Sequence, residues 1–234
     1  MNLDYELTSK SSESLHVLMA ACKSDKIANV KQAIQLAGKQ PVIIDVDAFA
    51  LQNCYELNYQ PRAGEIVALL NVGAATMNIN ILNGTRSIFA RDASVGGSQY
   101  TGLLQKELGV SFEQAEAVKR GMGLPDGVEA KPIQPIIETV SDILALEVKK
   151  TFDFYRTTAQ ENEAAIQKIL LAGGGSKLPG LPDFLSKRFE IPVDIFDPFR
   201  QIEVDARKFD PDYMREIVPE MAVAVGLALR GVEA

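Results

Sequence analysis

Three consecutive glycines, Gly173, Gly174 and Gly175, follow a strand-like segment at residues 166–171 and precede a helix-like segment at residues 181–189. Glycine loses more conformational freedom on folding than any other residue, so an ordered triplet costs stability. A position that uses one usually needs an unhindered backbone, and close approach of a ligand is the commonest such need. The alternative is a flexible turn between a strand and a helix. Both interpretations place a strand, a turn and a helix in succession, which favours an α/β fold.

The triplet does not belong to either of two familiar phosphate-binding motifs. The Walker A loop has the pattern Gly-x-x-x-x-Gly-Lys-Ser/Thr, which is absent from the sequence. The dinucleotide fingerprint ends in a glycine, whereas Leu178 occupies that position here.

The remaining hydrophobic pattern predicts strands and helices in an order typical of a mixed sheet. Asn83 and Gly84 form a type I′ hairpin sequence, so residues 66–93 are predicted to form an antiparallel meander of three strands. Residues 15–22 are predicted to form a buried strand. Strands are predicted at residues 3–7, 15–22, 41–46, 66–72, 78–82, 87–93, 166–171 and 192–196. Helices are predicted at residues 24–37, 47–57, 98–108, 111–120, 133–155, 181–189 and 219–230.

The turn between the first two strands of the meander is a candidate phosphate-binding hairpin. It runs from Asn71 to Thr76 and contains Gly73 and Ala74, so its backbone can come close to a ligand. Backbone amides and the Thr76 hydroxyl are groups that can cradle a phosphate. The alternative is a plain tight turn in which Gly73 only supplies an unusual backbone conformation.

A charged trio lies on one face of the predicted helix at residues 111–120. Glu116, Lys119 and Arg120 could bracket a nucleoside, with the carboxylate binding the sugar hydroxyls and the cationic side chains lying on the base. The alternative is a solvated helix face with a charge pair at helical spacing.

Asp45 and Asp47 stand where a predicted strand passes into a predicted helix. A carboxylate in such a place can orient a water for attack on a phosphoryl group. It can equally cap the helix, which is the alternative interpretation.

Composition excludes several classes of protein. The 24 lysines and arginines against 31 aspartates and glutamates give a net charge of −7, which argues against a nucleic-acid binder or a basic membrane anchor. Two cysteines, Cys22 and Cys54, and one histidine cannot build a zinc site or a disulfide scaffold. The apolar run at residues 221–229 is shorter than the roughly 20 residues that span a bilayer. A cytoplasmic chain is therefore expected.

Taken together and in this order, the motifs resemble those of the actin-like nucleotide-binding superfamily. The resemblance is strongest to its branch of PilM type IV pilus assembly proteins, which are relatives of the cell-division protein FtsA. The pair Gly96 and Gly97 after the meander and the terminal segment at residues 222–230 also match this pattern. The resemblance covers nearly the whole chain. It implies an α/β fold: an actin-like, ribonuclease-H-like lobe with a mixed sheet and helices, plus a small β-rich subdomain.

The resemblance also implies the cofactors ATP and Mg²⁺. In relatives the hairpin binds phosphates, while the helix with the charged trio and the glycine triplet face the adenosine. The residues implied for this site are Asn71, Gly73, Ala74, Thr76, Gly96, Gly97, Glu116, Lys119, Arg120, Gly173, Gly174, Gly175 and Ser176.

Two residues depart from the family pattern. Relatives begin the hairpin with an aspartate that helps to organise Mg²⁺ and the attacking water, and Asn71 keeps the shape of that residue without its charge. Asp47 occupies the place of a water-orienting glutamate and is therefore the candidate catalytic residue. These departures favour a nucleotide-binding scaffold with at most weak ATPase activity. A small-metabolite kinase or ATPase of the same superfamily is the alternative.

The resemblance divides the chain into residues 1–58, a remnant of a first lobe, and residues 59–234, a second lobe with the adenosine loop. The family's opening Asp-x-Gly strand pair is absent before Leu15, so the first phosphate loop is expected to be missing. The implied partner is the cytoplasmic N-terminal tail of a PilN-like inner-membrane protein, which would hold the chain at the membrane. Because that tail docks on the first lobe, its capture is expected to be weak or absent. An uncovered cleft is expected to favour self-association.

Overall fold

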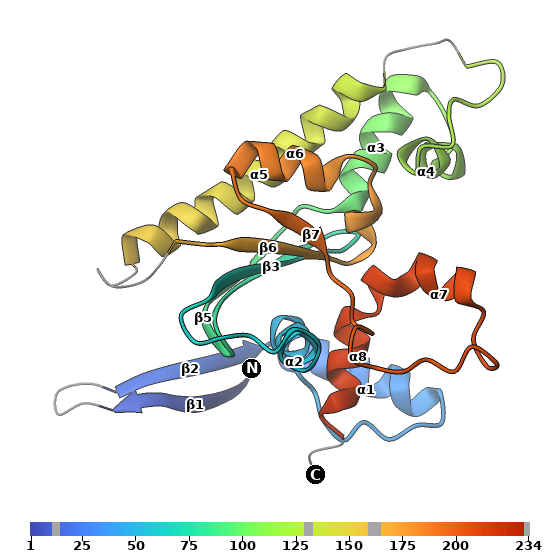
Figure 1. Cartoon of the computed structure of the whole chain (residues 1–234). Coiled ribbons are helices and arrows are strands. Elements are labelled where there is room, and N and C mark those ends of the chain that lie inside the picture. Colours follow the sequence, from blue (N-terminus) through green and yellow to red (C-terminus); the bar gives the residue numbers. More distant parts are fainter. Residues whose placement is uncertain (11–14, 129–132, 159–164, 232–234) are drawn as a thin grey trace. The chain divides into compact units, whose positions relative to one another are not determined.

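A computed structural model describes residues 1–10, 15–128, 133–158 and 165–231. The chain divides into two compact units, Met1–Val46 and Asp47–Ala234 (Figure 1). Each unit is described by itself. The division into lobes at residues 1–58 and 59–234 stays a prediction.

The first unit consists of an antiparallel strand pair and one helix. Strand β1 (Asn2–Lys10) pairs with β2 (Leu15–Cys22), and α1 (Ser24–Leu36) follows. The predicted strand at residues 41–46 is wrong, because the structure assigns no strand there. Its apolar side chains lie largely in solvent, with Val42 88% exposed. An apolar run forms a strand only where a neighbouring strand completes its hydrogen bonds, and none of the described strands does so.

One face of the strand pair is apolar and exposed. Leu3, Tyr5 and Leu7 lie opposite Ala21, Met19 and Val17 in register, so all six side chains share a face. Tyr5 is 69% exposed and Met19 62%. The predicted strand at residues 15–22 is therefore present, but the prediction that it is buried is wrong. We call these six residues the apolar ribbon face.

The second unit is built on a five-stranded mixed sheet with the order β5-β4-β3-β6-β7. The predicted meander is confirmed by antiparallel pairing of its three strands, and Gly84 adopts a φ of 59° in the turn between the second and third. The two later strands then add in parallel, β6 beside β3 and β7 beside β6. The strands are β3 (Ile66–Val72), β4 (Met77–Asn83), β5 (Arg86–Ala93), β6 (Lys168–Ala172) and β7 (Val193–Ile195).

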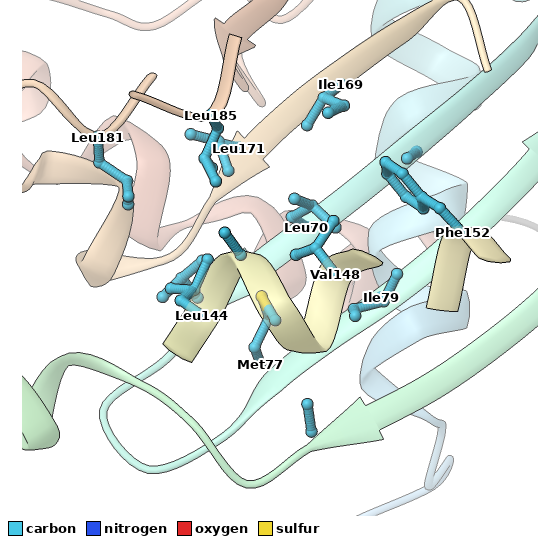
Figure 2. Packing of buried hydrophobic residues seen from close by; sticks show 14 of the residues in the cluster. Leu70, Met77, Ile79, Leu144, Val148, Phe152, Ile169, Leu171, Leu181 and Leu185 are labelled. Carbon is cyan, nitrogen blue, oxygen red and sulfur yellow. The ribbon is translucent and has the colours of Figure 1, made fainter. Parts of the chain in front are cut away.

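Three helices cover one face of this sheet: α3 (Gly97–Leu108), α5 (Gln134–Thr158) and α6 (Leu181–Phe189). The helix predicted at residues 133–155 is confirmed, and its side chains Leu144, Val148 and Phe152 are buried against the sheet. Figure 2 shows these side chains meeting Leu70 and Ile79 from the strands. The main hydrophobic core of the unit therefore lies between the sheet and α5.

The opposite face of the sheet packs against α2 (Asp47–Tyr59) and α8 (Ala222–Leu229) (Figure 1). These helices approach closely at Gly226, where an added Cβ would stand 1.7 Å from the Ala50 carbonyl oxygen. Asn80 on β4 ties the sheet to the first turn of α2, because its Nδ2 donates to the Ala48 carbonyl at 3.1 Å. The start of α2 is thereby fixed over this face.

Two shorter helices complete the unit. Helix α4 (Phe112–Lys119) begins with a capping box between Ser111 and Gln114. Helix α7 (Pro211–Ile217) was not predicted, although Asp210 caps it and Pro211 occupies its first turn. The short turns η1 (Gly174–Lys177) and η2 (Val218–Glu220) join the longer elements. Among the described helices, none combines the length and apolarity that a membrane span needs.

Candidate nucleotide-binding site

A cavity of about 370 Å³ opens on the second unit where the meander hairpin, the start of α3, helix α4 and the glycine triplet meet. Its size falls in the range of about 300–1,000 Å³ that is typical of small-molecule sites. The wall contains backbone from the two glycine-rich segments and charged side chains from α4. Its lining residues are Gly73, Ala74, Gly97, Ser98, Tyr100, Phe112, Glu116, Lys119, Arg120, Gly174, Gly175, Lys177, Leu178 and Glu220.

Most of the residues predicted for the cofactor site thus meet in one cavity, but some do not line it. Those outside the wall are Asn71, Thr76, Gly96, Gly173 and Ser176, together with the candidate catalytic residue Asp47. Ser176 is 2% exposed and its hydroxyl donates to the Gly173 carbonyl at 2.7 Å. This buried hydrogen bond stabilises the glycine loop. Asp47 begins α2 on the sheet face that α2 and α8 cover.

The hairpin is held against the start of α3. The amides of Gly97 and Ser98 donate to the carbonyls of Gly73 and Ala74 at 2.9 and 2.8 Å. A Cβ on Gly96 would lie 2.5 Å from the Gly73 oxygen, so glycine at 96 is required by packing within the protein. The first amides of α3 therefore fix the hairpin that forms one side of the cavity.

Packing against β3 explains two of the three glycines, Gly173 and Gly175, although Gly175 also lines the cavity. Gly173 has a φ of 81°, and a Cβ there would lie 2.5 Å from the Val72 carbonyl oxygen. A Cβ on Gly175 would lie 2.4 Å from Val72 Cγ1. Gly174 is different, because a Cβ there would make only ordinary contacts, the nearest at 3.6 Å from Glu220 Oε1. Close approach to β3 therefore accounts for Gly173 and Gly175, whereas Gly174 lines the cavity with room for a Cβ.

A polar cluster forms the wall on the α3 and α4 side. Lys119 Nζ donates to Glu116 Oε1 at 2.5 Å and to Thr101 Oγ1 at 2.9 Å. The Thr101 hydroxyl, buried at 1% exposure, also donates to Glu116 Oε1. Partial burial alone would raise the pKa of Glu116, but hydrogen bonds from Lys119 and Thr101, with the nearby charges of Lys119 and Arg120, outweigh it and lower this pKa. The carboxylate is therefore held in its charged form.

Several members of this region were not predicted as site residues from the sequence, and Thr101 and Glu220 are two that make specific contacts. Thr101 lies one helical turn after Gly97, a spacing that places both on one face of α3. Glu220 forms an ion pair with Lys177 at 2.8 Å and thereby joins η2 to the end of η1. Because 43 residues separate these two along the chain, no local pattern could have paired them.

A row of polar side chains crosses the meander at the base of the hairpin. Asn71 Nδ2 donates to Asn78 Oδ1 at 2.9 Å, and Asn78 Nδ2 donates to Asp92 Oδ1 at 2.7 Å. Asn71 Oδ1 lies beside Gly173, where an added Cβ would stand 2.6 Å from it. The side chain that begins the hairpin is thus held by the sheet.

The cavity fits a nucleotide better than it fits a resident metal ion. Its glycine-lined backbone admits a large ligand, and it combines a fixed carboxylate with the exposed ring of Phe112. Across the described parts of the chain, no group of three or more His, Cys, Asp or Glu residues could hold a metal ion. Mg²⁺ would have to be bound largely by phosphate oxygens and water, as is usual for nucleotide sites.

Comparison with known proteins identifies the family. The family model for the type IV pilus assembly protein PilM matches residues 1–232. The solved structure of a PilM–PilN type IV pilus biogenesis complex matches with a TM-score of 0.85 and 30% identity, over 100% of this chain and 67% of that chain.

More distant relatives share the fold. The ethanolamine utilization protein EutJ of Escherichia coli (strain K12) is 26% identical over 122 residues, which are 52% of this chain and 38% of EutJ. The chain thus spans about two-fifths of that relative's length. MreB 5 of Spiroplasma citri, solved bound to AMPPNP, matches with a TM-score of 0.63 and 13% identity, over 92% of this chain and 67% of that chain. These likenesses confirm the predicted α/β, actin-like fold with its mixed sheet. With the family model spanning nearly every residue, the chain belongs to the PilM family of type IV pilus assembly proteins.

Proposed function

We propose that this chain binds ATP, accompanied by Mg²⁺, in the cavity of its second unit and serves as a scaffold in type IV pilus assembly. The observation that carries the proposal is the meeting of the hairpin, the start of α3, Glu116 and the glycine triplet around one cavity. The actin-like neighbour MreB 5 was solved with AMPPNP, which makes a nucleotide the ligand to test first.

Each part of the wall suits a different part of the nucleotide. The backbone at Gly73 and Ala74 would face the phosphates, because small residues let amides approach closely. The Glu116 carboxylate would accept from the sugar hydroxyls. The Arg120 side chain and the ring of Phe112, which is 54% exposed, would contact the base. When bound, Mg²⁺ would neutralise phosphate charge.

The proposal is binding rather than rapid turnover. Asn71 supplies an amide where relatives carry a carboxylate. The side chain that would help to organise Mg²⁺ and the attacking water is therefore uncharged. Asp47 remains the candidate for orienting a water, from the first turn of α2. If Asp47 has this role, Asp47→Ala lowers the rate at which the chain hydrolyses ATP, while ATP affinity stays within about twofold.

The nucleotide proposal is tested with a fluorescent ATP analogue. Gly174→Asp adds a carboxylate to the cavity wall beside Glu220, so we expect affinity to fall by about tenfold or more. The matched control is Gly102→Asp, since Gly102 lies in α3 with no atom within 4 Å of an added Cβ. Circular dichroism checks the fold of both variants. Equal affinities in wild type and Gly174→Asp would contradict the proposal, as would absence of binding to the wild-type chain.

We further propose that the chain binds the cytoplasmic tail of a PilN-like inner-membrane protein, which would hold it at the membrane from the cytoplasmic side. The solved relative at 30% identity is a PilM–PilN complex. The apolar ribbon face offers exposed side chains in the region assigned to the first lobe, where the family resemblance puts the tail. Tyr5 and Met19 are directly opposite each other at its centre.

Capture of a synthetic tail peptide tests this second proposal. Met19→Glu adds a charge at the centre of the apolar ribbon face, and we expect it to weaken capture by about tenfold. Tyr213→Glu is the control, because Tyr213 is similarly exposed, at 58%, but lies on α7 in the other unit. Equal loss in both variants, or no capture by the wild-type chain, would contradict tail binding at this face.

A further inference from the structure

Helix α7 is held in place by contacts at its surface. All seven of its residues are partly or fully exposed, and Tyr213 is 58% exposed. The turn that follows it is better anchored: Pro219 in η2 is buried, and its carbonyl accepts from the Gly173 amide at 2.7 Å. A segment with so little burial opens more easily than the core of the unit. The few contacts that α7 makes with the rest of the unit therefore decide how firmly it is docked.

An ion-pair cluster joins this segment to η1. The ammonium group of Lys177 lies 2.8 Å from Glu220 Oε1 and 3.9 Å from Glu216 Oε1. Glu216 belongs to α7 and Glu220 to η2, so one cation faces two carboxylates from the same segment. We call Lys177, Glu216 and Glu220 the Lys177 cluster.

Two members of the Lys177 cluster, Lys177 and Glu220, also line the candidate cavity. Glu220 lies next to Gly174, since a Cβ added there would stand 3.6 Å from its Oε1. The side chain of Lys177 is 25% exposed and that of Glu220 46%, so water still reaches both. A ligand that fills the cavity displaces water from this side of the pair. Lys177 without its carboxylates would then be a poorly hydrated, unpaired charge, which is costly. A ligand in the cavity therefore favours the state in which α7 is docked.

We infer that the Lys177 cluster couples the cavity to α7, so that a bound nucleotide holds α7 in its docked position and docked α7 in turn strengthens nucleotide binding. This inference rests on the proposed nucleotide binding and concerns the regulation of that site. The coupling is reciprocal, because two linked equilibria change each other by the same factor. Displacement of α7 therefore weakens nucleotide binding.

Hydrogen exchange read by mass spectrometry tests the coupling in the whole chain, with and without ATP and Mg²⁺. In the wild-type chain we expect the nucleotide to slow amide exchange by about threefold or more in two segments, the hairpin at residues 71–76 and the segment at residues 211–220. Glu220→Gln keeps the size of the side chain but removes its charge. In this variant the nucleotide should still slow exchange in the hairpin but no longer at residues 211–220, and Lys177→Met should behave in the same way.

The matched control is Asp194→Asn. It removes a carboxylate from another surface ion pair, in which Asp194 Oδ2 lies 2.6 Å from Lys168 Nζ. Both residues lie outside the cavity wall. The two segments should therefore keep their wild-type response to the nucleotide in this variant.

Glu216→Gln separates coupling from direct contact with the ligand, because Glu216 belongs to the Lys177 cluster but lies outside the cavity wall. If docked α7 strengthens nucleotide binding, this variant binds ATP about twofold more weakly in calorimetry, as the loss of an exposed ion pair allows. Unchanged ATP affinity in Glu216→Gln would overturn the inference.

The exchange experiment can also overturn it. Slower exchange in the wild-type hairpin without any change at residues 211–220 would show that α7 is not coupled, while leaving the proposed nucleotide binding intact. A response at residues 211–220 that persists in both Glu220→Gln and Lys177→Met would show that the Lys177 cluster does not transmit it. No change in either segment of the wild-type chain would overturn both the inference and the proposed nucleotide binding.

Discussion

Asn78 donates a hydrogen bond of 2.7 Å from Nδ2 to the carboxylate of Asp92. A carboxylate only accepts, so this bond determines which way the Asn78 amide faces and leaves Oδ1 for Asn71. Asn71 must then present Nδ2 to Asn78, as the 2.9 Å bond between them shows. Its own Oδ1 is left beside Gly173. The uncharged residue that begins the hairpin thus presents an acceptor, as an aspartate would.

The hydrogen-bonded row of Asn71, Asn78 and Asp92 predicts that two destabilising substitutions compensate for each other. Asn71→Asp sets a carboxylate against Asn78 Oδ1, and we expect it to lower the free energy of unfolding by about 1–3 kcal/mol. Asp92→Asn alone should cost about 1 kcal/mol or less, since the new amide can still accept. In the double variant the row can reverse, with Asn78 donating to the carboxylate introduced at position 71. Urea unfolding should therefore show the double variant to be more stable than Asn71→Asp alone, whereas simple addition of the two losses would contradict this account.

Glu116 predicts a pH dependence of stability. Its pKa in the folded chain lies below the usual value of 4.5, so the unfolded chain binds the proton more readily. The contribution of Glu116 to stability is therefore complete above the unfolded pKa and is lost as the pH falls through the folded one. Urea unfolding of the wild type and Glu116→Gln between about pH 3 and 7 should show a difference that is constant near neutrality and shrinks below about pH 4.5. A difference that grows on acidification would contradict the direction.

Gly226 predicts a large effect of one methyl group. Gly226→Ala would put a Cβ 1.7 Å from the Ala50 carbonyl oxygen, so α8 must move away from α2. We expect a loss of about 3 kcal/mol in the free energy of unfolding. Gly102→Ala is the matched control: it meets no atom within 4 Å and should stabilise α3 by about 0.5–1 kcal/mol. Chemical denaturation distinguishes the two, and similar effects of both substitutions would refute the close approach.

Self-association is a further prediction. The apolar ribbon face presents six apolar side chains in register, and such faces favour contact with another apolar surface. Sedimentation velocity should show species larger than a monomer as concentration rises, and Met19→Glu should reduce them. A monomer at every concentration in the wild-type chain would exclude self-association.

Local sequence patterns predicted the elements whose cause is itself local. The hairpin at Asn83 and Gly84 and the helices predicted at residues 111–120 and 133–155 each depend on residues within a few positions of one another. Helix α7 has local signals too, in Asp210 and Pro211, but its seven residues were too short for a periodic pattern to stand out. Residues 41–46 were wrongly predicted as a strand from their apolar run. Such a run forms a strand only where a neighbouring strand completes its hydrogen bonds.

The sequence by itself determined the α/β class, the meander, the long helix and the set of motifs that point to the PilM family, because propensity, periodicity and turn chemistry act over short stretches of chain. Only the tertiary structure decided what each motif residue does. It assigned Gly173 and Gly175 to close packing on β3 and placed both Gly174 and Gly175 in the cavity wall. It also brought Thr101 beneath Glu116. These roles depend on distances between segments far apart in the chain, and such distances are set when the sheet and its helices pack together.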